Sequence, residues 1–312
     1  VSIFCEGSIT PVSEILLTAG GAEAINNAFL AVLNPGDEAI VFTPAFMNYE
    51  NLISMCGATM VNIPLRKKNG FQIDPQELAE HISSKTKLII LNNPCNPTGV
   101  VYTAETLEKV ANIAKEHDLL VFSDEIYNQI TYDGVSCTSI ASFPGMKERT
   151  ILMNGFSKAY AMTGWRLGYL AASSRMLSNL LKVHQYTTTC VPTFVQEGLA
   201  ETMNAPETMA EVKQMVAAFD RRRKLFMQGL DAIGNLEYVK PQGAFYIFID
   251  VSKTGMDGDE FASRLLEERY VACVPGSKLG SHCGNFVRIS YATSDENIKE
   301  GLARIDEFLN KK

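Results

Sequence analysis

Apolar runs alternate with longer amphipathic stretches over residues 10–124. The runs are β-rich and nearly continuous, as in Leu-Ile-Ile-Leu, which is typical of strands that helices cover on both faces. Strands that alternate with helical segments predict βαβ units. We therefore expect an α/β fold with a mainly parallel sheet covered by helices on both faces, and strands at Glu14–Thr18, Glu38–Phe42, Thr59–Pro64, Thr86–Asn92 and Leu119–Asp124.

The middle of the chain continues this pattern. Short apolar runs at Thr150–Met153 and Leu167–Ala172 flank a segment rich in glycine, serine and aromatic residues. Helical periodicity is expected at Ala22–Val32, Ala104–His117 and Thr193–Met203. The polar stretch His184–Pro192 is expected to be a connection that lines a site or an interface, with His184 in a structural role.

The pattern changes at about Pro206, where a long amphipathic helix begins that should reach Ile233. Further strands and helices then alternate without the βαβ rhythm, which indicates a smaller α+β domain. We predict a large domain over 1–205 and a small C-terminal domain over 206–312. The expected strands are Leu236–Pro241, Ala244–Asp250, Val271–Val274 and Phe286–Ser290, and the expected helices are Asp257–Arg269 and Ser294–Asn310.

Composition narrows the class of protein. The chain has 312 residues, of which 46% are apolar and 20% charged, and its net charge of −7 with no basic block argues against nucleic acid as a partner. Seven scattered cysteines without a Cys-x-x-Cys pair are expected to be reduced thiols, which favours the cytoplasm. No long apolar run or charged leader suggests a membrane or export, and no metal-ligand cluster is evident.

Polar and small residues follow several of the predicted strands, at the edge where open α/β sheets bind ligands. Gly20, Gly21 and Ala22 stand where the first strand turns into a helix, whose free amides and dipole suit an anion. The motif is neither a dinucleotide fingerprint nor a Walker loop, and alone it is more often a tight turn.

Two further loops leave strands at this edge. Phe46 could offer an aromatic face to a flat heteroaromatic cofactor, although a core phenylalanine is the equal alternative. Asn96 lies in Asn-Asn-Pro-Cys-Asn-Pro-Thr-Gly, a stiff loop that would aim its amide at a phenolate oxygen or a substrate carboxylate. The alternative is an Asx turn that binds nothing.

Asp124 ends a buried strand and needs a cationic partner, because an isolated buried charge is costly. A protonated pyridine nitrogen would supply it, and Tyr127 would then reach the neighbouring ring oxygen. Glu125 is expected to point elsewhere and to be structural. Without a cofactor, Asp124 would more often cap a helix or bind a metal.

Lys158 and Arg166 complete the set, with Ser157 beside the lysine. An amine attacks carbonyls when its pKa is lowered, whereas a guanidinium stays charged and suits phosphate. An aldehyde and a phosphate on one molecule describe pyridoxal phosphate. In the second domain, Arg288 on the strand Phe286–Ser290 would bind a carboxylate through two hydrogen bonds. Its alternative is a surface ion pair.

In their order along the chain, these motifs resemble the class I and II aminotransferases, which are pyridoxal-phosphate enzymes of fold type I. The motifs are Gly-Gly before a helix, Asn-Pro-Cys-Asn-Pro-Thr-Gly, Asp-Glu-Ile-Tyr, Ser-Lys-(x)7-Arg-Leu-Gly and Phe-Val-Arg-Ile-Ser. The resemblance implies an aspartate- or aromatic-aminotransferase-like enzyme that moves the amino group of an L-amino acid to a 2-oxo acid by a ping-pong mechanism. It also implies a homodimer with active sites near the subunit interface.

The resemblance assigns roles to individual residues. It implies that Lys158 binds the aldehyde and catalyses transfer, that Asp124 pairs with the ring nitrogen, and that Tyr127 and Asn96 contact the ring oxygen. It further implies that Phe46 stacks on the ring and that Arg288, with Asn96 and Phe46 nearby, binds the substrate. The residues that it places around the phosphate are Gly20, Gly21, Ala22, Ser157 and Arg166.

The sequence departs from the family pattern at three places. No counterpart of the family's N-terminal arm is present, Phe46 replaces a frequent tryptophan or tyrosine, and Gly155 replaces a frequent serine. Two alternatives therefore stay open beside transamination. One is a β-lyase or decarboxylase that uses the same cofactor, and the other is an inactive binding or regulatory module.

Overall fold

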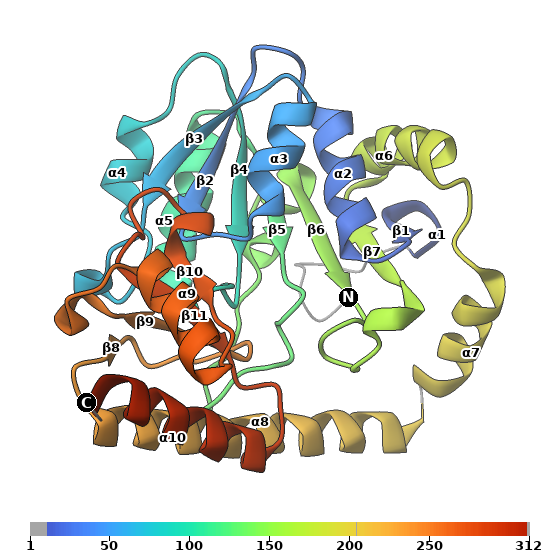
Figure 1. Ribbon diagram of the computed structural model, residues 1–312. Coiled ribbons are helices and arrows are strands. Elements are labelled where there is room, and N and C mark those ends of the chain that lie inside the picture. Colours follow the sequence, from blue (N-terminus) through green and yellow to red (C-terminus); the bar gives the residue numbers. More distant parts are fainter. Residues whose placement is uncertain (1–10, 204, 311–312) are drawn as a thin grey trace.

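A computed structural model describes residues 11–203 and 205–310 of the chain and shows two lobes, each built on one sheet (Figure 1). The larger sheet, counted over these residues, has seven strands in the order β1-β7-β6-β5-β4-β2-β3. Strands β2 to β6 pair in parallel, whereas β7 is antiparallel to both of its neighbours. Their bounds are β1 (Ile15–Thr18), β2 (Glu38–Thr43), β3 (Thr59–Pro64), β4 (Thr86–Asn92), β5 (Leu120–Asp124), β6 (Thr150–Gly155) and β7 (Gly168–Ala171).

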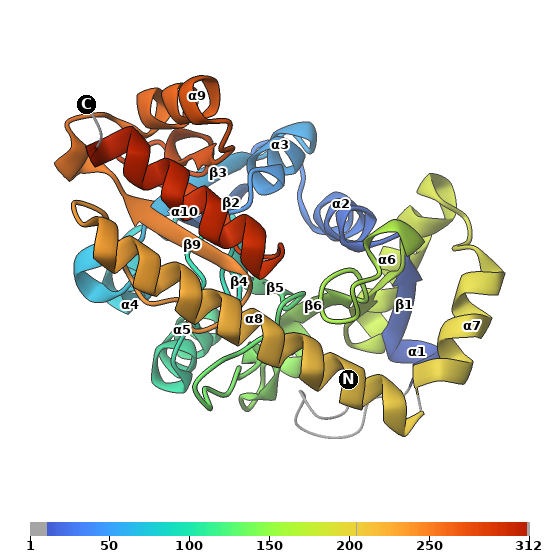
Figure 2. The ribbon, with the colours of Figure 1, turned by 60° about the horizontal axis from the view of Figure 1, so that its bottom comes forward.

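Helices cover both faces of this sheet (Figure 2). Alternate strand residues enter two separate cores: Ile90 and Phe122 pack in the core of α2, whereas Ile89 and Val121 pack in the core of α5. This alternation explains why the strands are apolar at successive positions. The helices of this lobe are α1 (Pro11–Glu14), α2 (Gly21–Val32), α3 (Asn48–Met55), α4 (Pro75–Glu80), α5 (Ala104–Glu116), α6 (Ser174–Thr187) and α7 (Thr193–Met203).

The second lobe carries a four-stranded antiparallel sheet, in the order β10-β11-β9-β8. It is joined to the first lobe by α8 (Pro206–Ile233), a helix of 28 residues that runs beneath both lobes with α10 beside it (Figure 1). The predicted fold class is thus confirmed. The remaining elements are β8 (Glu237–Tyr238), β9 (Tyr246–Asp250), α9 (Gly258–Arg269), β10 (Val274–Pro275), β11 (Phe286–Ser290) and α10 (Asp295–Asn310).

Two predicted strands of the small sheet differ from the structure. The strand expected at Val271–Val274 is wrong, because the partner strand β11 pairs only with Val274 and Pro275. The strand expected at Leu236–Pro241 is reduced to Glu237–Tyr238. Both segments are at the edges of the small sheet, and only two residues of each pair with the neighbouring strand, although their composition is β-rich.

The expected connection at His184–Pro192 is wrong in its first part, since α6 continues to Thr187. Leu177, Leu180 and His184 are buried along one face of the helix, so helical periodicity prevails over the polar composition. The His184 ring nitrogen Nδ1 lies 2.7 Å from a carboxylate oxygen of Glu23, which agrees with the structural role predicted for this histidine.

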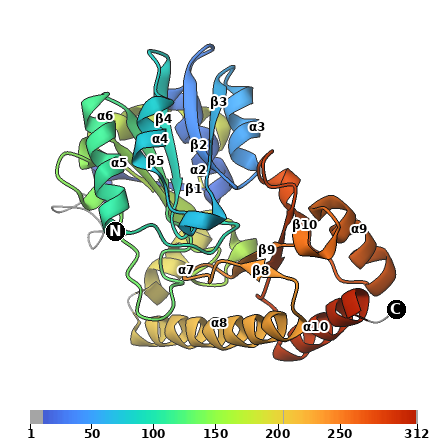
Figure 3. The same ribbon diagram turned by 90° about the vertical axis from the view of Figure 1, so that its left-hand side faces the viewer.

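The two lobes also meet through the segment that follows β3 (Figure 3). The Phe71 ring packs edge-on against Phe248 and Phe286, with ring centres 5.9 and 6.0 Å away. Beside it, the Lys67 ammonium contacts the carboxylates of Glu237 and Asp250. These contacts fix the small sheet against the large one next to the cavity described below.

Candidate active site

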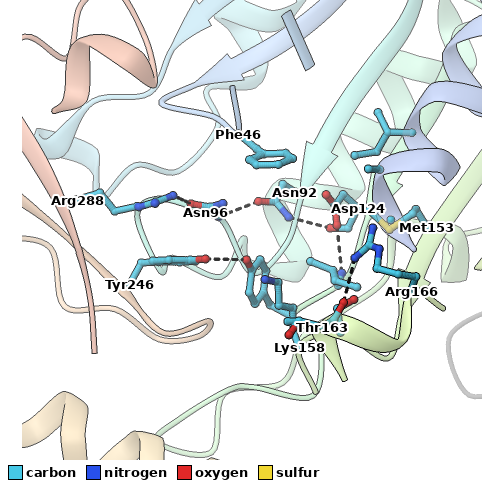
Figure 4. Close-up of a pocket in the computed structure, with 16 residues that line it drawn as sticks. Phe46, Asn92, Asn96, Asp124, Met153, Lys158, Thr163, Arg166, Tyr246 and Arg288 are labelled. Atoms are coloured by element: carbon cyan, nitrogen blue, oxygen red, sulfur yellow. Dashed lines mark hydrogen bonds between the residues drawn. The ribbon is translucent and has the colours of Figure 1, made fainter. Parts of the chain in front are cut away.

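A cavity of about 360 Å³ lies where β4, β5 and β6 end, between the start of α2 and the small sheet (Figure 4). The ends of parallel strands are the expected binding edge of such a sheet. Side chains or backbone from nearly every predicted site residue line this cavity, and Gly20 joins them through its contact with Arg166. Those that line it are Gly21, Ala22, Phe46, Asn96, Asp124, Tyr127, Ser157, Lys158, Arg166 and Arg288.

One end of the cavity is built to receive an anion. Gly20 has φ of 81°, and a Cβ placed on it would lie 2.6 Å from Nη2 of Arg166, so only glycine fits this turn. The Arg166 guanidinium donates to the carbonyl oxygens of Thr163 (3.1 Å) and Ala19 (3.4 Å) beside the first turn of α2. The amides of a first helical turn have no intrahelical partner. Together they provide charge and donors for a phosphate.

Asp124, the last residue of β5, is fully buried at the bottom of the cavity. Its Oδ2 accepts a hydrogen bond from the Tyr49 hydroxyl (2.5 Å) and its Oδ1 one from the amide of Ile126 (3.2 Å). Burial raises the pKa of this carboxyl to about 6, against the opposing effects of the two hydrogen bonds and the Lys158 charge. No lysine or arginine in the described chain is within ion-pair distance of it, so the carboxyl is suited to a cationic ligand.

Lys158 follows β6 and is half-buried in the same cavity. Burial lowers the pKa of its ammonium below the ordinary value. The charge of Arg288 lowers this pKa too, whereas Asp124 raises it and Arg166 lowers it. A larger share of the amine is therefore unprotonated than in a solvated lysine, which is what attack on a carbonyl requires.

A chain of hydrogen bonds joins Asp124 to Arg288 along the cavity wall (Figure 4). Asn92 Nδ2 donates to the Asp124 carbonyl (3.1 Å), and its Oδ1 accepts from the amide of Asn96 (2.7 Å). Asn96 Oδ1 in turn accepts from Nη1 of Arg288 (2.9 Å). Because its oxygen is used in this way, the Nδ2 donor of Asn96 is left for a ligand.

Phe46 covers the cavity opposite Lys158 (Figure 4). Its ring is edge-on to Tyr49, with ring centres 5.7 Å apart and planes at 86°. The ring is half-buried and lines the cavity, so it can cover one face of a flat ligand. Tyr49 thus supports both the ring that covers the ligand and the carboxylate at the cavity floor.

Several residues that line this cavity or support its walls were not predicted from the sequence. Tyr49 lies close to Phe46 and Asn92 belongs to the Asn96 loop, but each reaches the site through a hydrogen bond to Asp124 on a different strand. Tyr246 enters from the small sheet; from the sequence, the segment Gly243–Tyr246 could equally bring an aromatic residue toward the cleft or pack in the core, and the structure places Tyr246 at the cavity. The position of Asn92 at the end of β4 was the one signal that could have found it; Met153 and Thr163, which also line the cavity, gave none.

The donor set fits pyridoxal phosphate. The cavity combines an anion site held open by Gly20, a buried carboxyl that lacks a cation, an amine of lowered pKa and an aromatic cover. These correspond to the phosphate, ring nitrogen, aldehyde and ring face of that cofactor. Within the described ranges, no three histidine, cysteine or acidic side chains form a group that could hold a metal ion.

Comparisons with known proteins agree with this chemistry. The family model described as aminotransferase class I and II matches residues 6–305. The aspartate aminotransferase of Pyrococcus abyssi is 42% identical over 302 residues, which cover 97% of this chain and 77% of that protein. The aromatic-amino-acid aminotransferase 2 of Thermococcus litoralis is 39% identical with the same coverage. The crystal structure of the aromatic aminotransferase from Pyrococcus horikoshii OT3 superposes with a TM-score of 0.96 at 40% identity, covering 99% of this chain and 82% of that one.

Proposed function

This chain belongs to the class I and II aminotransferase family, and from that premise we propose how the residues around the cavity divide the work. The protein is a pyridoxal-phosphate-dependent aminotransferase of fold type I, acting on amino acids and 2-oxo acids. The observation that carries the proposal is that a lysine of lowered pKa shares one cavity with a buried carboxyl that lacks a cation.

Each part of the cofactor has a proposed partner. Lys158 would bond to the aldehyde carbon, Asp124 would pair with the ring nitrogen, and Phe46 would cover the ring face. Tyr127 and Asn96 would contact the ring oxygen. The phosphate would be held by Gly20, Gly21, Ala22, Ser157 and Arg166. When bound, the cofactor supplies an electron sink that makes the α-proton of an amino acid acidic.

The protein's own groups then bind the substrate and move its proton. Arg288 takes the substrate carboxylate through two parallel hydrogen bonds, with the Asn96 amide beside it. Nζ of Lys158 would become a free amine when the substrate's amino group replaces it at the aldehyde, and it would then accept the α-proton as a general base. In the reverse half-reaction the same group, as an ammonium, would return a proton to the α-carbon. Ionised Asp124 keeps a negative charge at the cavity floor throughout.

A half-reaction tests this assignment. Holoenzyme mixed with an amino donor and no oxo acid should release one equivalent of 2-oxo acid per site and no ammonia, and steady-state kinetics with both substrates should be ping-pong. Release of ammonia would indicate β-elimination, and release of carbon dioxide would indicate decarboxylation. Lys158→Ala should abolish the half-reaction, whereas Lys182→Ala, at an exposed position on α6, should leave it unchanged.

We also propose that the chain works as a homodimer with its active sites near the interface. Tyr186 and Phe194, around the junction of α6 and α7, are 91% and 73% exposed, which is unusual for such large side chains and suits a covered surface. Sedimentation velocity should give twice the mass of the chain, and a monomer would contradict the proposal.

Two further proposals concern location and lobes. The described cysteines are unpaired, which supports the cytoplasm, and none of the described helices has the length and apolar character needed to cross a membrane. Cys5 lies outside the described residues.

We propose domains at 1–205 and 206–312, because α8 begins at Pro206 and each range holds one sheet.

A further inference from the structure

Tyr246 is a nearly buried tyrosine that lines the cavity, and the assignments above give it no role. It is the first residue of β9 and so belongs to the small sheet. Its side chain contacts two of the residues proposed to act in the reaction. One is Arg288 on the neighbouring strand (Figure 4), and the other is Tyr127 in the large lobe. The ring serves one of these contacts and the hydroxyl the other.

The contact with Arg288 follows from the register of the small sheet. Arg288 on β11 pairs with Phe248 on β9, and Tyr246 lies two residues from Phe248, so Arg288 and Tyr246 are diagonal neighbours on one face. The guanidinium carbon lies 4.5 Å from the centre of the Tyr246 ring. A guanidinium attracted to a ring face loses rotational freedom.

The hydrogen bond from Arg288 to Asn96 restrains the guanidinium group in a second direction. Nη1 donates to Asn96 Oδ1, while the ring of Tyr246 holds the guanidinium carbon. With both constraints the guanidinium is held before a substrate arrives, and its other donors are available for a carboxylate. Less entropy is then lost when the two parallel hydrogen bonds form.

The hydroxyl contact concerns the proton of Tyr127. The two hydroxyl oxygens, of Tyr246 and Tyr127, lie 3.1 Å apart. Burial, together with Tyr246 and Asp124, raises the pKa of Tyr127 well above its ordinary value, so Tyr127 keeps its one proton at neutral pH. If Tyr246 donates to Tyr127, the Tyr127 proton is free to point into the cavity.

We propose that Tyr246 is a positioning residue with two separable actions: its ring orients Arg288 for the substrate carboxylate, and its hydroxyl directs the Tyr127 proton toward the cofactor's ring oxygen. The proposal rests on the function proposed above. Because the residue belongs to the small lobe and Tyr127 to the large one, the hydroxyl pair also joins the carboxylate site to the cofactor site across the two lobes.

Two variants of the holoenzyme separate the actions. Tyr246→Phe keeps the ring and removes the hydroxyl, and Tyr246→Leu removes both. Binding is measured with the 2-methyl derivative of the amino donor, which carries the carboxylate but has no α-proton to lose. The absorbance spectrum of the bound cofactor is recorded as a function of pH, and the midpoint pH of its change is called the absorbance transition.

For Tyr246→Phe we expect an unchanged dissociation constant for the methyl derivative, with kcat lowered about tenfold. The absorbance transition should move up by about half a pH unit. The cofactor's ring oxygen would receive a weaker hydrogen bond and keep more negative charge, so the protonated form of the cofactor would persist to a higher pH. For Tyr246→Leu we expect the same spectral shift and, in addition, a dissociation constant raised about tenfold, since the guanidinium loses its ring.

Tyr238→Phe is the matched control. This tyrosine is also in the small sheet, but its hydroxyl donates to Asp231 (2.8 Å) away from the cavity, so no parameter should change. Unchanged binding in Tyr246→Leu would overturn the action on Arg288, and an unshifted transition in Tyr246→Phe would overturn the action on Tyr127. Failure of the wild-type half-reaction would instead contradict the proposed function, so the two results are distinct.

Discussion

The buried carboxyl of Asp124 destabilises the cofactor-free protein when it is ionised. Burial raises the pKa of its carboxyl from 3.8 to about 6, so the folded protein binds this proton more tightly than the unfolded chain does. Stability linked to this group is therefore lost as pH rises from about 4 to about 6, and at neutral pH the ionised carboxyl destabilises the fold by about 3 kcal/mol. In the assignment proposed above, a protonated ring nitrogen of the cofactor would remove that penalty.

Asp124→Asn should for this reason stabilise the cofactor-free protein while abolishing transfer. We expect a gain of about 1–2 kcal/mol at pH 8, less than the full penalty because asparagine keeps only one of the two acceptors used by Tyr49 and Ile126. Near pH 4 the difference between variant and wild type should shrink, since both side chains are then neutral. Urea unfolding of the two cofactor-free proteins at both pH values measures it; equal stability at pH 8 would contradict the argument.

At the scale of single residues, the sequence predicted those that a strand delivers. Asp124 was found because the carboxyl ends of parallel strands meet at one edge, and Lys158 and Arg166 because small residues surround them. Tyr49 and Tyr246 were not assigned, because their roles depend on hydrogen bonds between residues 75 and 119 positions apart in the chain. No local pattern encodes such a pairing.

At the scale of elements, α8 is anchored by a fully buried arginine. Nη2 of Arg223 contacts the carboxylates of Asp220 (2.6 Å) and Asp133 (2.8 Å), and its guanidinium carbon lies 4.5 Å from the Tyr132 ring centre. Nη1 also donates to the carbonyl oxygen of Pro241. The arginine thus ties the helix between the lobes to the loop after β5 and to the approach to β9.

Arg223→Met should destabilise the protein by about 2–4 kcal/mol. The lower end applies if Asp133 and Asp220, which are partly exposed, regain water when the guanidinium is removed. Arg221→Met is the matched control on the same helix, because Arg221 is exposed and its ion pair with Asp295 should contribute less than about 1 kcal/mol. Urea unfolding of both variants gives the comparison, and equal losses would refute a special role for the buried arginine.

Element boundaries show where pattern and packing disagree. The long helix and the strands β3, β4 and β11 were predicted with the observed bounds, since periodicity and breakers coincide there. The run Val271–Val274 has strand composition, but only its last residue finds a partner on β11. In α6 the buried spacing of Leu177, Leu180 and His184 extends a helix through residues whose polarity suggested a loop.

At the scale of the whole molecule, Phe71 joins the lobes beside the active site. Phe71→Ala removes a ring that packs edge-on against the stacked rings of Phe248 and Phe286 and should cost about 3–5 kcal/mol of stability. Because the small sheet carries Arg288, we expect KM for the amino donor to rise about tenfold, as the carboxylate site loses its fixed position. The affinity for the cofactor should stay within about twofold.

Steady-state kinetics and cofactor titration of the same Phe71→Ala preparation test this together. Phe308→Ala is a useful control, because Phe308 packs on Phe261 within the small lobe and makes no ring contact with the described residues of the large lobe. It should lower stability without raising KM. A KM that rises equally in both variants would show that general loosening, and not the joint between lobes, is responsible.

The distribution of the site over the two lobes has a consequence for turnover. Lys158, Asp124, Tyr127 and Arg166 all belong to the large lobe, whereas Arg288 belongs to the small one. In the assignment proposed above, a small rotation of one lobe on the other would release the departing oxo acid while the residues proposed to hold the cofactor stay together. The cofactor that carries the amino group would then stay bound until the second oxo acid arrives, as a reaction in two separate half-reactions requires.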